Sequence, residues 1–251
     1  MPQREQYPLL VVDAGNSAVK FAVVARAGAT PKLLRSVPTA KLTPATAGRA
    51  RDGIRSVVVS SVVPAASRIL KRVFPAAQFV GPRTALAFKS LANRKTTGAD
   101  RLANMAAAHA CYGTNVLVAS FGTAATFDII DGGGIHRGGA ITPGWKSFAG
   151  ILSTRTALLP RVDAKKAVRF TGTDTRGALA AGVAGGYAAM VSSIIAAMKR
   201  EAGVKKLRVV FTGGDALVVA ALLPVKAISD PLLTMRGIAI LARGIGREGS
   251  K

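Results

Sequence analysis

The stretch VVDAGNSAVK, from Val11 to Lys20, decides the fold of this chain. The apolar residues 9–12 are typical of a buried strand, and a second apolar run follows at residues 19–25. Between the two runs stand Asp13 and a turn of small residues, 14–17. The stretch therefore predicts two strands joined by a tight turn, with a carboxylate at the mouth of the turn.

This hairpin carries the groups that a phosphate-binding turn needs. Gly15 lets the backbone approach a phosphate closely, and the N–H groups of the turn, with Asn16 and Ser17, can donate to its oxygens. Lys20 adds a positive charge, and Asp13 is suited to hold Mg²⁺ directly or through water. An ordinary hairpin explains the same residues equally well. The stretch alone leaves both interpretations open.

The composition is that of a globular protein. Of the 251 residues, 49% are hydrophobic and 19% are charged, which predicts one large domain or two medium ones. No apolar run is expected to reach the length of a membrane span, and the first residues, MPQREQYP, do not read as a signal peptide. A single cysteine excludes an internal disulfide, and two histidines disfavour a histidine-rich metal site. We expect a soluble cytoplasmic protein.

The net charge of +23 raises the question of a nucleic-acid partner. The basic residues are dispersed, however, and form no block of the length typical of a binding arm. Aromatic residues are only 5%, too few for a base-stacking surface. A positive field also attracts anionic metabolites such as ATP. We therefore do not expect a nucleic-acid or membrane partner.

The hairpin pattern returns about a hundred residues later. A predicted strand at 116–119 leads through the turn Ser120-Phe121-Gly122-Thr123 into another at 124–130. This repeat of the strand–turn–strand pattern predicts two similar lobes that face a cleft, with a boundary near Thr114. We expect residues 1–113 to hold the first hairpin and residues 114–251 the second. Further elements are expected as strands at 57–63, 78–80 and 207–211, helices at 65–73, 100–112, 145–159, 175–201 and 230–243, and a loop at 82–97.

A second group of polar residues, Gly98-Ala99-Asp100-Arg101, stands at the start of the predicted helix 100–112. An aspartate there can orient and deprotonate a substrate hydroxyl, while the adjacent arginine binds a carboxylate in a bidentate manner. The segment alone is explained as well by a helix cap and a surface ion pair.

Taken together, the motifs resemble those of one family. They occur in the order DAGNSAVK, SSVVP, TGADR, SFGTAAT, GGAITPGW, FTGTDT, FTGG and SDPLLTMRG. This order resembles type III pantothenate kinase, a family of the acetate and sugar kinase/Hsp70/actin superfamily, over residues 9–241. The resemblance implies an α/β fold of two actin-like (ribonuclease H-like) lobes, each a mixed sheet flanked by helices, with a cleft between them.

The resemblance also implies an activity. It is the ATP-dependent phosphorylation of pantothenate to 4'-phosphopantothenate, the first step of coenzyme A biosynthesis, in a homodimer that uses Mg²⁺ and a monovalent cation, K⁺ or NH4⁺. Asp100 is implied as the general base and Arg101 as the carboxylate ligand. The implied pantothenate site comprises Gly98, Ala99, Asp100, Arg101, the residue at Leu91 and, across the dimer interface, Thr175. The implied nucleotide site comprises Asp13, Ala14, Gly15, Asn16, Ser17, Ala18, Val19, Lys20, Thr123, Gly213 and Gly214.

The chain departs from the family pattern at three positions. Ser120 stands where the family usually has a cation-binding aspartate, and a hydroxyl is a weaker ligand, so the potassium requirement is open. Leu91 replaces a tyrosine that contacts substrate, and Thr96 replaces a glutamate. These changes keep a second hypothesis open, that of a catalytically weak relative that binds nucleotide and acts as an accessory protein.

Overall fold

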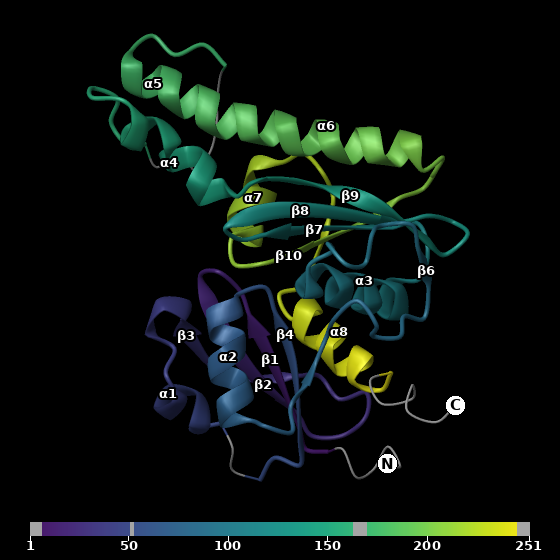
Figure 1. The fold of residues 1–251 in the computed structure, drawn as a ribbon. Coiled ribbons are helices and arrows are strands. Elements are labelled where there is room, and N and C mark those ends of the chain that lie inside the picture. Colours follow the sequence, from purple (N-terminus) through teal and green to yellow (C-terminus); the bar gives the residue numbers. More distant parts are fainter. Residues whose placement is uncertain (1–6, 51–52, 163–169, 245–251) are drawn as a thin grey trace. The chain divides into compact units, whose positions relative to one another are not determined.

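The computed structural model describes residues 7–50, 53–162 and 170–244 (Figure 1). The chain folds into two compact units, one of Met1–Gly113 with Leu232–Lys251 and the other of Thr114–Pro231. Each unit is built on a mixed β-sheet flanked by helices. The predicted fold class, α/β with two similar lobes, is confirmed.

The sheet of the first unit has the strand order β3-β2-β1-β4-β5. Strands β1 to β3 pair antiparallel, and β4 and β5 join parallel to β1. The strands are β1 (Leu9–Ala14), β2 (Ala18–Val24), β3 (Lys32–Pro38), β4 (Ser56–Ser61) and β5 (Gln78–Phe79). The β1–β2 hairpin is the one that the opening stretch predicts.

Helices cover both faces of this sheet. On one face, α1 (Pro44–Gly48) and α2 (Pro64–Val73) bury a core that includes Val12, Val59 and Leu70. On the other face, α3 (Ala99–Tyr112) and α8 (Leu233–Ala242) pack against β1 and β4 and against each other. A Cβ on Gly237 would lie 1.8 Å from the carbonyl oxygen of Ala103, so the two helices pack this closely only with glycine there. A 3-10 turn, η2 (Thr39–Lys41), and a short strand, β6 (Lys89–Ser90), complete the unit.

The second unit repeats the strand order of the first. Within it the strands run β11-β10-β7-β8-β9, with β7, β8 and β9 antiparallel and β10 and β11 parallel to β7. Phe121, Phe127 and Phe211 make edge-to-face contacts at the centre of its core. The strands are β7 (Val116–Phe121), β8 (Ala124–Ile130), β9 (Ile135–Pro143), β10 (Arg208–Thr212) and β11 (Ile228–Ser229).

The helices of the second unit are α4 (Trp145–Arg155), α5 (Thr175–Ala180), α6 (Gly186–Glu201) and α7 (Ala216–Leu222), with a π-helical turn η3 (Ala181–Gly185) joining α5 to α6. Tyr187 is fully buried between the rings of Trp145 and Phe148. Trp145 therefore packs inside this unit.

The continuous helical stretch Thr175–Glu201 meets the length and composition of a membrane span, contrary to the expectation that no apolar run does. Its most apolar window is 44% buried inside the protein. The buried face includes Tyr187, Val191 and Ile195, which pack into the core of the second unit. Core helices of soluble proteins meet the same criterion, so the stretch is weak evidence for a membrane.

Three sequence expectations need correction. Ser120 and Phe121 belong to strand β7, so the turn consists of Gly122 and Thr123 only. Strands β3 and β9 were not expected, because each has a single buried residue and so lacks a continuous apolar run. Helix α8 was expected to close the second lobe, whereas the chain returns to the first unit for it.

Candidate active site

The β1–β2 turn holds its polar groups at the surface. Its backbone is fixed by a hydrogen bond from the Gly15 N–H to the Ala18 carbonyl, at 3.1 Å. Thr39 secures it from outside, because its hydroxyl donates to the Gly15 carbonyl at 2.6 Å and its N–H to the Ser17 carbonyl at 3.1 Å. Asn16 and Ser17 are exposed. The turn is thus a braced loop whose outer face is open to a ligand.

Two candidate residues of this segment have another role. Ala14 and Val19 are fully buried in the core of the first unit, so only their backbone groups are available to a nucleotide. A Cβ on Gly15, in contrast, would meet only the Ala18 carbonyl oxygen, at an ordinary 3.6 Å. The fold itself does not require glycine at this position.

Asp13 lies in a row of polar residues across three strands. Its cross-strand partner on β2 is Lys20, and its partner on β4 is Ser60. Loss of solvation raises the pKa of the Asp13 carboxyl to about 7, the charge of Asp100 adds to the increase, and Lys20 opposes it. The first unit therefore brings the metal-binding candidate and the general-base candidate close enough to interact.

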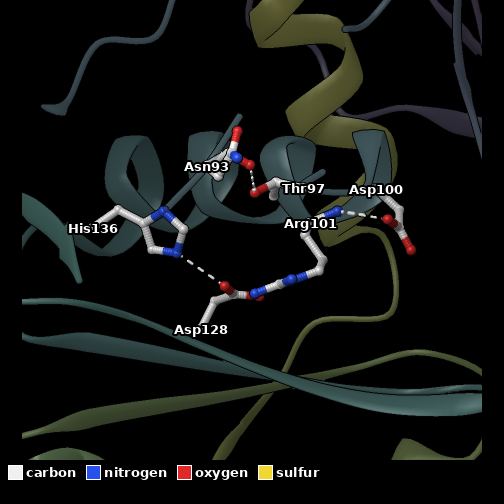
Figure 2. A network of polar contacts seen from close by, with 6 residues as sticks. All are labelled: Asn93, Thr97, Asp100, Arg101, Asp128 and His136. Atoms are coloured by element: carbon white, nitrogen blue, oxygen red, sulfur yellow. Dashed lines mark hydrogen bonds and ion pairs between the residues drawn. The ribbon is translucent and has the colours of Figure 1, made fainter. Parts of the chain in front are cut away.

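Asp100 is held at the start of α3. Its Oδ1 accepts a hydrogen bond from the Arg101 N–H at 2.8 Å (Figure 2). A Cβ on Gly98 would lie 2.5 Å from this oxygen and 3.5 Å from the Val62 side chain. Glycine at the N-cap of α3 is therefore what lets the carboxylate fold over the first turn.

The segment before α3 is a turn built on Asn93. The Thr97 hydroxyl donates to the Asn93 carbonyl at 2.8 Å (Figure 2). The Asn93 side chain accepts from the Lys95 N–H at 3.0 Å. Leu91 is 53% exposed and offers no polar group where the family has a tyrosine hydroxyl. The backbone of this segment is thus well held, while Leu91 lacks the polar group that the resemblance implies at its position.

In the second unit, the β7–β8 turn packs closely on α4. The Thr123 carbonyl accepts from the Gly144 N–H at 3.1 Å and from the Ser147 hydroxyl at 3.2 Å. A Cβ on Gly144 would lie 1.9 Å from the Gly122 carbonyl oxygen, so glycine is obligatory there. The Thr123 side chain remains exposed beside this turn.

The β10 turn packs against the end of β7. Gly213 has a φ of +93°, and a Cβ there would lie 2.3 Å from the Phe121 carbonyl oxygen. The same oxygen accepts a hydrogen bond from the Asp215 N–H at 3.1 Å. Gly214, in contrast, faces open space. The second unit therefore gathers the end of β7 with Ser120, the Gly122–Thr123 turn and the Gly213–Gly214 turn.

Sequence reasoning missed an ion pair at these loops. Lys146 Nζ lies 2.9 Å from Asp215 Oδ1, which ties the start of α4 to the β10 turn. The carboxylate is buried, whereas the lysine side chain is 74% exposed. Asp215 directly follows Gly213 and Gly214, and Lys146 is the second residue of α4, after Gly144 and Trp145. This closeness to glycines was the only available signal in the sequence.

A buried pair of a histidine and an aspartate also lies in the second unit. His136 Nε2 is 2.9 Å from Asp128 Oδ1, and both residues are buried (Figure 2). Asp128 lies on β8 and His136 on the adjacent strand β9, so the pair links two neighbouring strands of the sheet.

Thr175 borders an apolar groove. It is exposed at the first position of α5, whose N-cap Asp174 accepts a hydrogen bond from the Gly177 N–H at 2.6 Å. The groove between α4 and α5 has a volume of about 620 Å³ and includes Phe148, Ile151 and Leu152 in its wall. Ile151 and Leu152 are large apolar residues left exposed.

The family model "Type III pantothenate kinase" matches residues 9–197. A type III pantothenate kinase of Akkermansia muciniphila is 35% identical over 237 residues, covering 93% of this chain and 97% of that protein. One from Listeria monocytogenes is 38% identical over 197 residues, with coverage of 76% and 75%. One from Methylacidiphilum infernorum is 32% identical over 238 residues, with coverage of 93% and 87%.

Solved structures agree in fold. A protein described as a Baf family transcriptional activator from Campylobacter jejuni superposes with a TM-score of 0.63 at 24% identity, covering 93% of this chain and 97% of that one. Ethanolamine utilization protein EutJ from Carboxydothermus hydrogenoformans superposes with a TM-score of 0.54 at 14% identity, covering 92% of this chain and 89% of that one. At these identities the likeness concerns the fold alone. The family match and the identity to curated relatives over most of their length establish that this chain belongs to the type III pantothenate kinase family.

Proposed function

We propose that the protein transfers the γ-phosphoryl group of ATP to the primary hydroxyl of pantothenate, the first step of coenzyme A biosynthesis. The observation that carries this proposal is the interaction of Asp13 and Asp100 in the first unit, beside the open β1–β2 turn. Phosphoryl transfer needs positioning and charge neutralisation more than covalent chemistry from the protein. A carboxylate for the metal next to a carboxylate for the proton provides both.

Asp13 and the turn that follows it are the proposed phosphate and metal site. The donor set fits Mg²⁺, which is commonly held by one or two carboxylates together with substrate phosphates and water. Bound there, Mg²⁺ would supply charge neutralisation for the phosphate oxygens. The N–H groups of the turn donate to those oxygens, and Lys20, the cross-strand partner of Asp13, adds a positive charge.

Asp100 is the proposed general base. It accepts the proton of the pantothenate hydroxyl as that oxygen forms a bond to the γ-phosphorus, and the bond from this phosphorus to ADP breaks. Arg101 is the proposed ligand of the pantothenate carboxylate, because guanidinium matches carboxylate geometry in a bidentate contact. Gly98 keeps space for the Asp100 carboxylate at the helix start.

In the second unit, the proposed nucleotide contacts are the Thr123 hydroxyl and the backbone at Gly213 and Gly214. Support comes from Gly214, where a Cβ would meet no chain atom within 4 Å, so the chain leaves this surface open. Ser120 is the proposed site of a monovalent cation, K⁺ or NH4⁺. Its single hydroxyl binds a cation less strongly than a carboxylate, and we therefore expect only a weak dependence of the rate on that ion.

We further propose a cytoplasmic homodimer in which the groove between α4 and α5 receives a second copy of the chain. The exposed Ile151 and Leu152 favour burial against a partner, and Thr175 on the groove wall is the residue expected to contact pantothenate across that interface. Light scattering after gel filtration should give twice the mass of one chain. Leu152→Glu should give a monomer, whereas a wild-type monomer would contradict the proposal.

A coupled assay for ADP, with Mg²⁺, ATP and pantothenate in potassium, ammonium or sodium buffer, tests the activity. Asp100→Asn should lower kcat by about 10²- to 10⁴-fold while leaving ATP binding intact, because the loss of a general base affects the chemical step. Lys95→Gln, on the exposed turn before α3, is the matched control and should retain the wild-type rate. ATP binding without turnover in all three buffers would instead favour the accessory protein, to which Leu91 and Ser120 point.

A further inference from the structure

The motif SSVVP has no role in the proposed mechanism, yet it contains an unsatisfied polar group. Ser60 is fully buried in β4, and its Oγ has no hydrogen-bond partner in the described part of the chain. A buried hydroxyl without a partner costs free energy. Valine or alanine at this position would avoid the cost, so the hydroxyl calls for a functional explanation.

Successive side chains of β4 point to opposite faces of the sheet, and this decides which way Ser60 faces. Val59 belongs to the core under α1 and α2, and Ser61 accepts a hydrogen bond from Ser67 of α2 at 2.8 Å. Ser60 lies between these two and must face the opposite side of the sheet, where α3 and α8 pack.

Asp13 lies on the same face, next to Ser60. Its neighbours Val12 and Ala14 belong to the core under α1 and α2, so Asp13 also faces α3 and α8. Asp13 and Ser60 are direct partners in the parallel pairing of β1 and β4, and paired strands lie about 4.8 Å apart. A seryl hydroxyl at that spacing reaches a neighbouring carboxylate after rotation about one side-chain bond.

We propose that Ser60 is a positioning residue that donates a hydrogen bond to the ionised Asp13 carboxylate and holds it in the orientation that binds the metal–nucleotide phosphates. This role rests on the proposed function for its consequence in catalysis. The pairing of the two side chains is a property of the free protein.

The second unit supports this assignment by repetition. Thr212 of β10 is buried, its Oγ1 also has no partner among the described residues, and it is the direct partner of Ser120 in the parallel pairing of β7 and β10. Both units thus place a buried unpaired hydroxyl beside the fifth residue of their central strand. In the first unit, that residue is a carboxylate, which is the stronger acceptor.

Lys20, the partner of Asp13 on β2, and Asp100 of α3 both act on the charge of Asp13. The helices packed on this face of the sheet also carry Arg101 in α3 and Arg236 in α8. A substitution at Ser60 changes none of these four residues. A change in the Asp13 carboxyl resonance would therefore report the hydroxyl itself.

The experiment records the Asp13 carboxyl carbon resonance by NMR at pH 9, in ligand-free protein with labelled aspartate, assigned with Asp13→Asn. At this pH the carboxyl is ionised, and Ser60→Ala should shift the resonance because the carboxylate loses the hydroxyl donor. Ser60→Thr, which keeps the hydroxyl, should restore the wild-type resonance. Ser61→Ala is the matched control, since it removes the same atom from the next residue on the other face.

Kinetics provide the second measurement. Ser60→Ala should raise the apparent KM for Mg²⁺ by about tenfold at pH 9 with a smaller change in kcat, because the carboxylate is less well oriented for the metal. The same Asp13 resonance in wild type, Ser60→Ala and Ser61→Ala would overturn the proposal. The NMR result holds even if the wild-type protein fails to phosphorylate pantothenate, so the two failures are distinguishable. If the alanine variant does not fold, Ser60→Cys, whose thiol is a weaker donor than the hydroxyl, should shift the same resonance.

Discussion

The two units have the same strand order but differ in the charge at the end of the central strand. In the first, β1 presents Asp13, and in the second, the corresponding position of β7 is Ser120. Both residues sit beside a buried hydroxyl on the parallel neighbour, Ser60 or Thr212. The duplicated topology thus decides where polar groups gather, and the identity of one side chain decides which unit carries the negative charge.

The turns of the two units differ as well. In the second unit, Gly144 and Gly213 approach other backbone atoms so closely that no side chain fits. In the first unit, Gly15 has ordinary space around its Cβ position. At Gly144 and Gly213 glycine therefore serves packing, whereas at Gly15 it leaves the backbone open to a ligand.

Removal of the negative charge at the end of β1 should have the largest effect on catalysis. Asp13→Asn should lower kcat/KM by about 10³-fold, because the metal-binding carboxylate is lost, whereas Ser120→Ala should cost less than about tenfold. Steady-state kinetics at saturating Mg²⁺ measure both. Equal losses would show that the two strand ends are equivalent in catalysis.

Substitutions at Gly213 and Gly15 should separate an effect on stability from an effect on ATP binding. Gly213→Ala should lower the free energy of unfolding by about 2–4 kcal/mol, since its φ is positive and its Cβ would clash with backbone. Gly15→Ala should change it by less than about 1 kcal/mol yet weaken ATP binding. Chemical denaturation and calorimetric titration with ATP check the pair, and a stable Gly213→Ala protein would contradict this account.

The pH dependence of stability should reveal the raised pKa of Asp13. Its pKa is about 7 in the folded protein against an ordinary 3.8, so the folded state holds a proton that the unfolded state has lost between these values. The ionised carboxyl is therefore destabilising, and its cost grows as the pH rises from about 4 to 7 and is complete above 7. Asp13→Asn should melt higher than wild type at pH 8 and no higher at pH 3.5. The same advantage at both pH values would argue against the raised pKa.

Loss of the ion pair between Lys146 and Asp215 should have the smallest effect, a small change in melting temperature. Lys146 is largely exposed, so Lys146→Gln should shift the melting temperature by less than about 2 °C, and less still in high salt. Differential scanning calorimetry measures this. A larger loss would mean that Lys146 and Asp215 fix the loops of the second unit more firmly than an exposed pair can.

Much of the candidate site was predictable because its signals are local. The apolar runs around Asp13, the small residues of the turn and the glycine before Asp100 each follow from short-range backbone preferences. The end of β7 was not, because Ser120 and Phe121 directly precede Gly122 and so look like part of the turn, whereas pairing with β8 and β10 makes them strand. Lys146 and Asp215 were missed since nothing local relates the start of α4 to the β10 turn.

The sequence by itself determined the strand–turn–strand hairpins, the start of a helix next to Asp100 and the family, because these depend on neighbouring residues and on motif order. Only the tertiary structure decided that Asp13 lies beside Ser60 and interacts with Asp100, and that α8 returns to the first unit. The physical reason is that desolvation and side-chain pairing arise between segments far apart in the chain. Such contacts exist only once the sheet and its covering helices have packed.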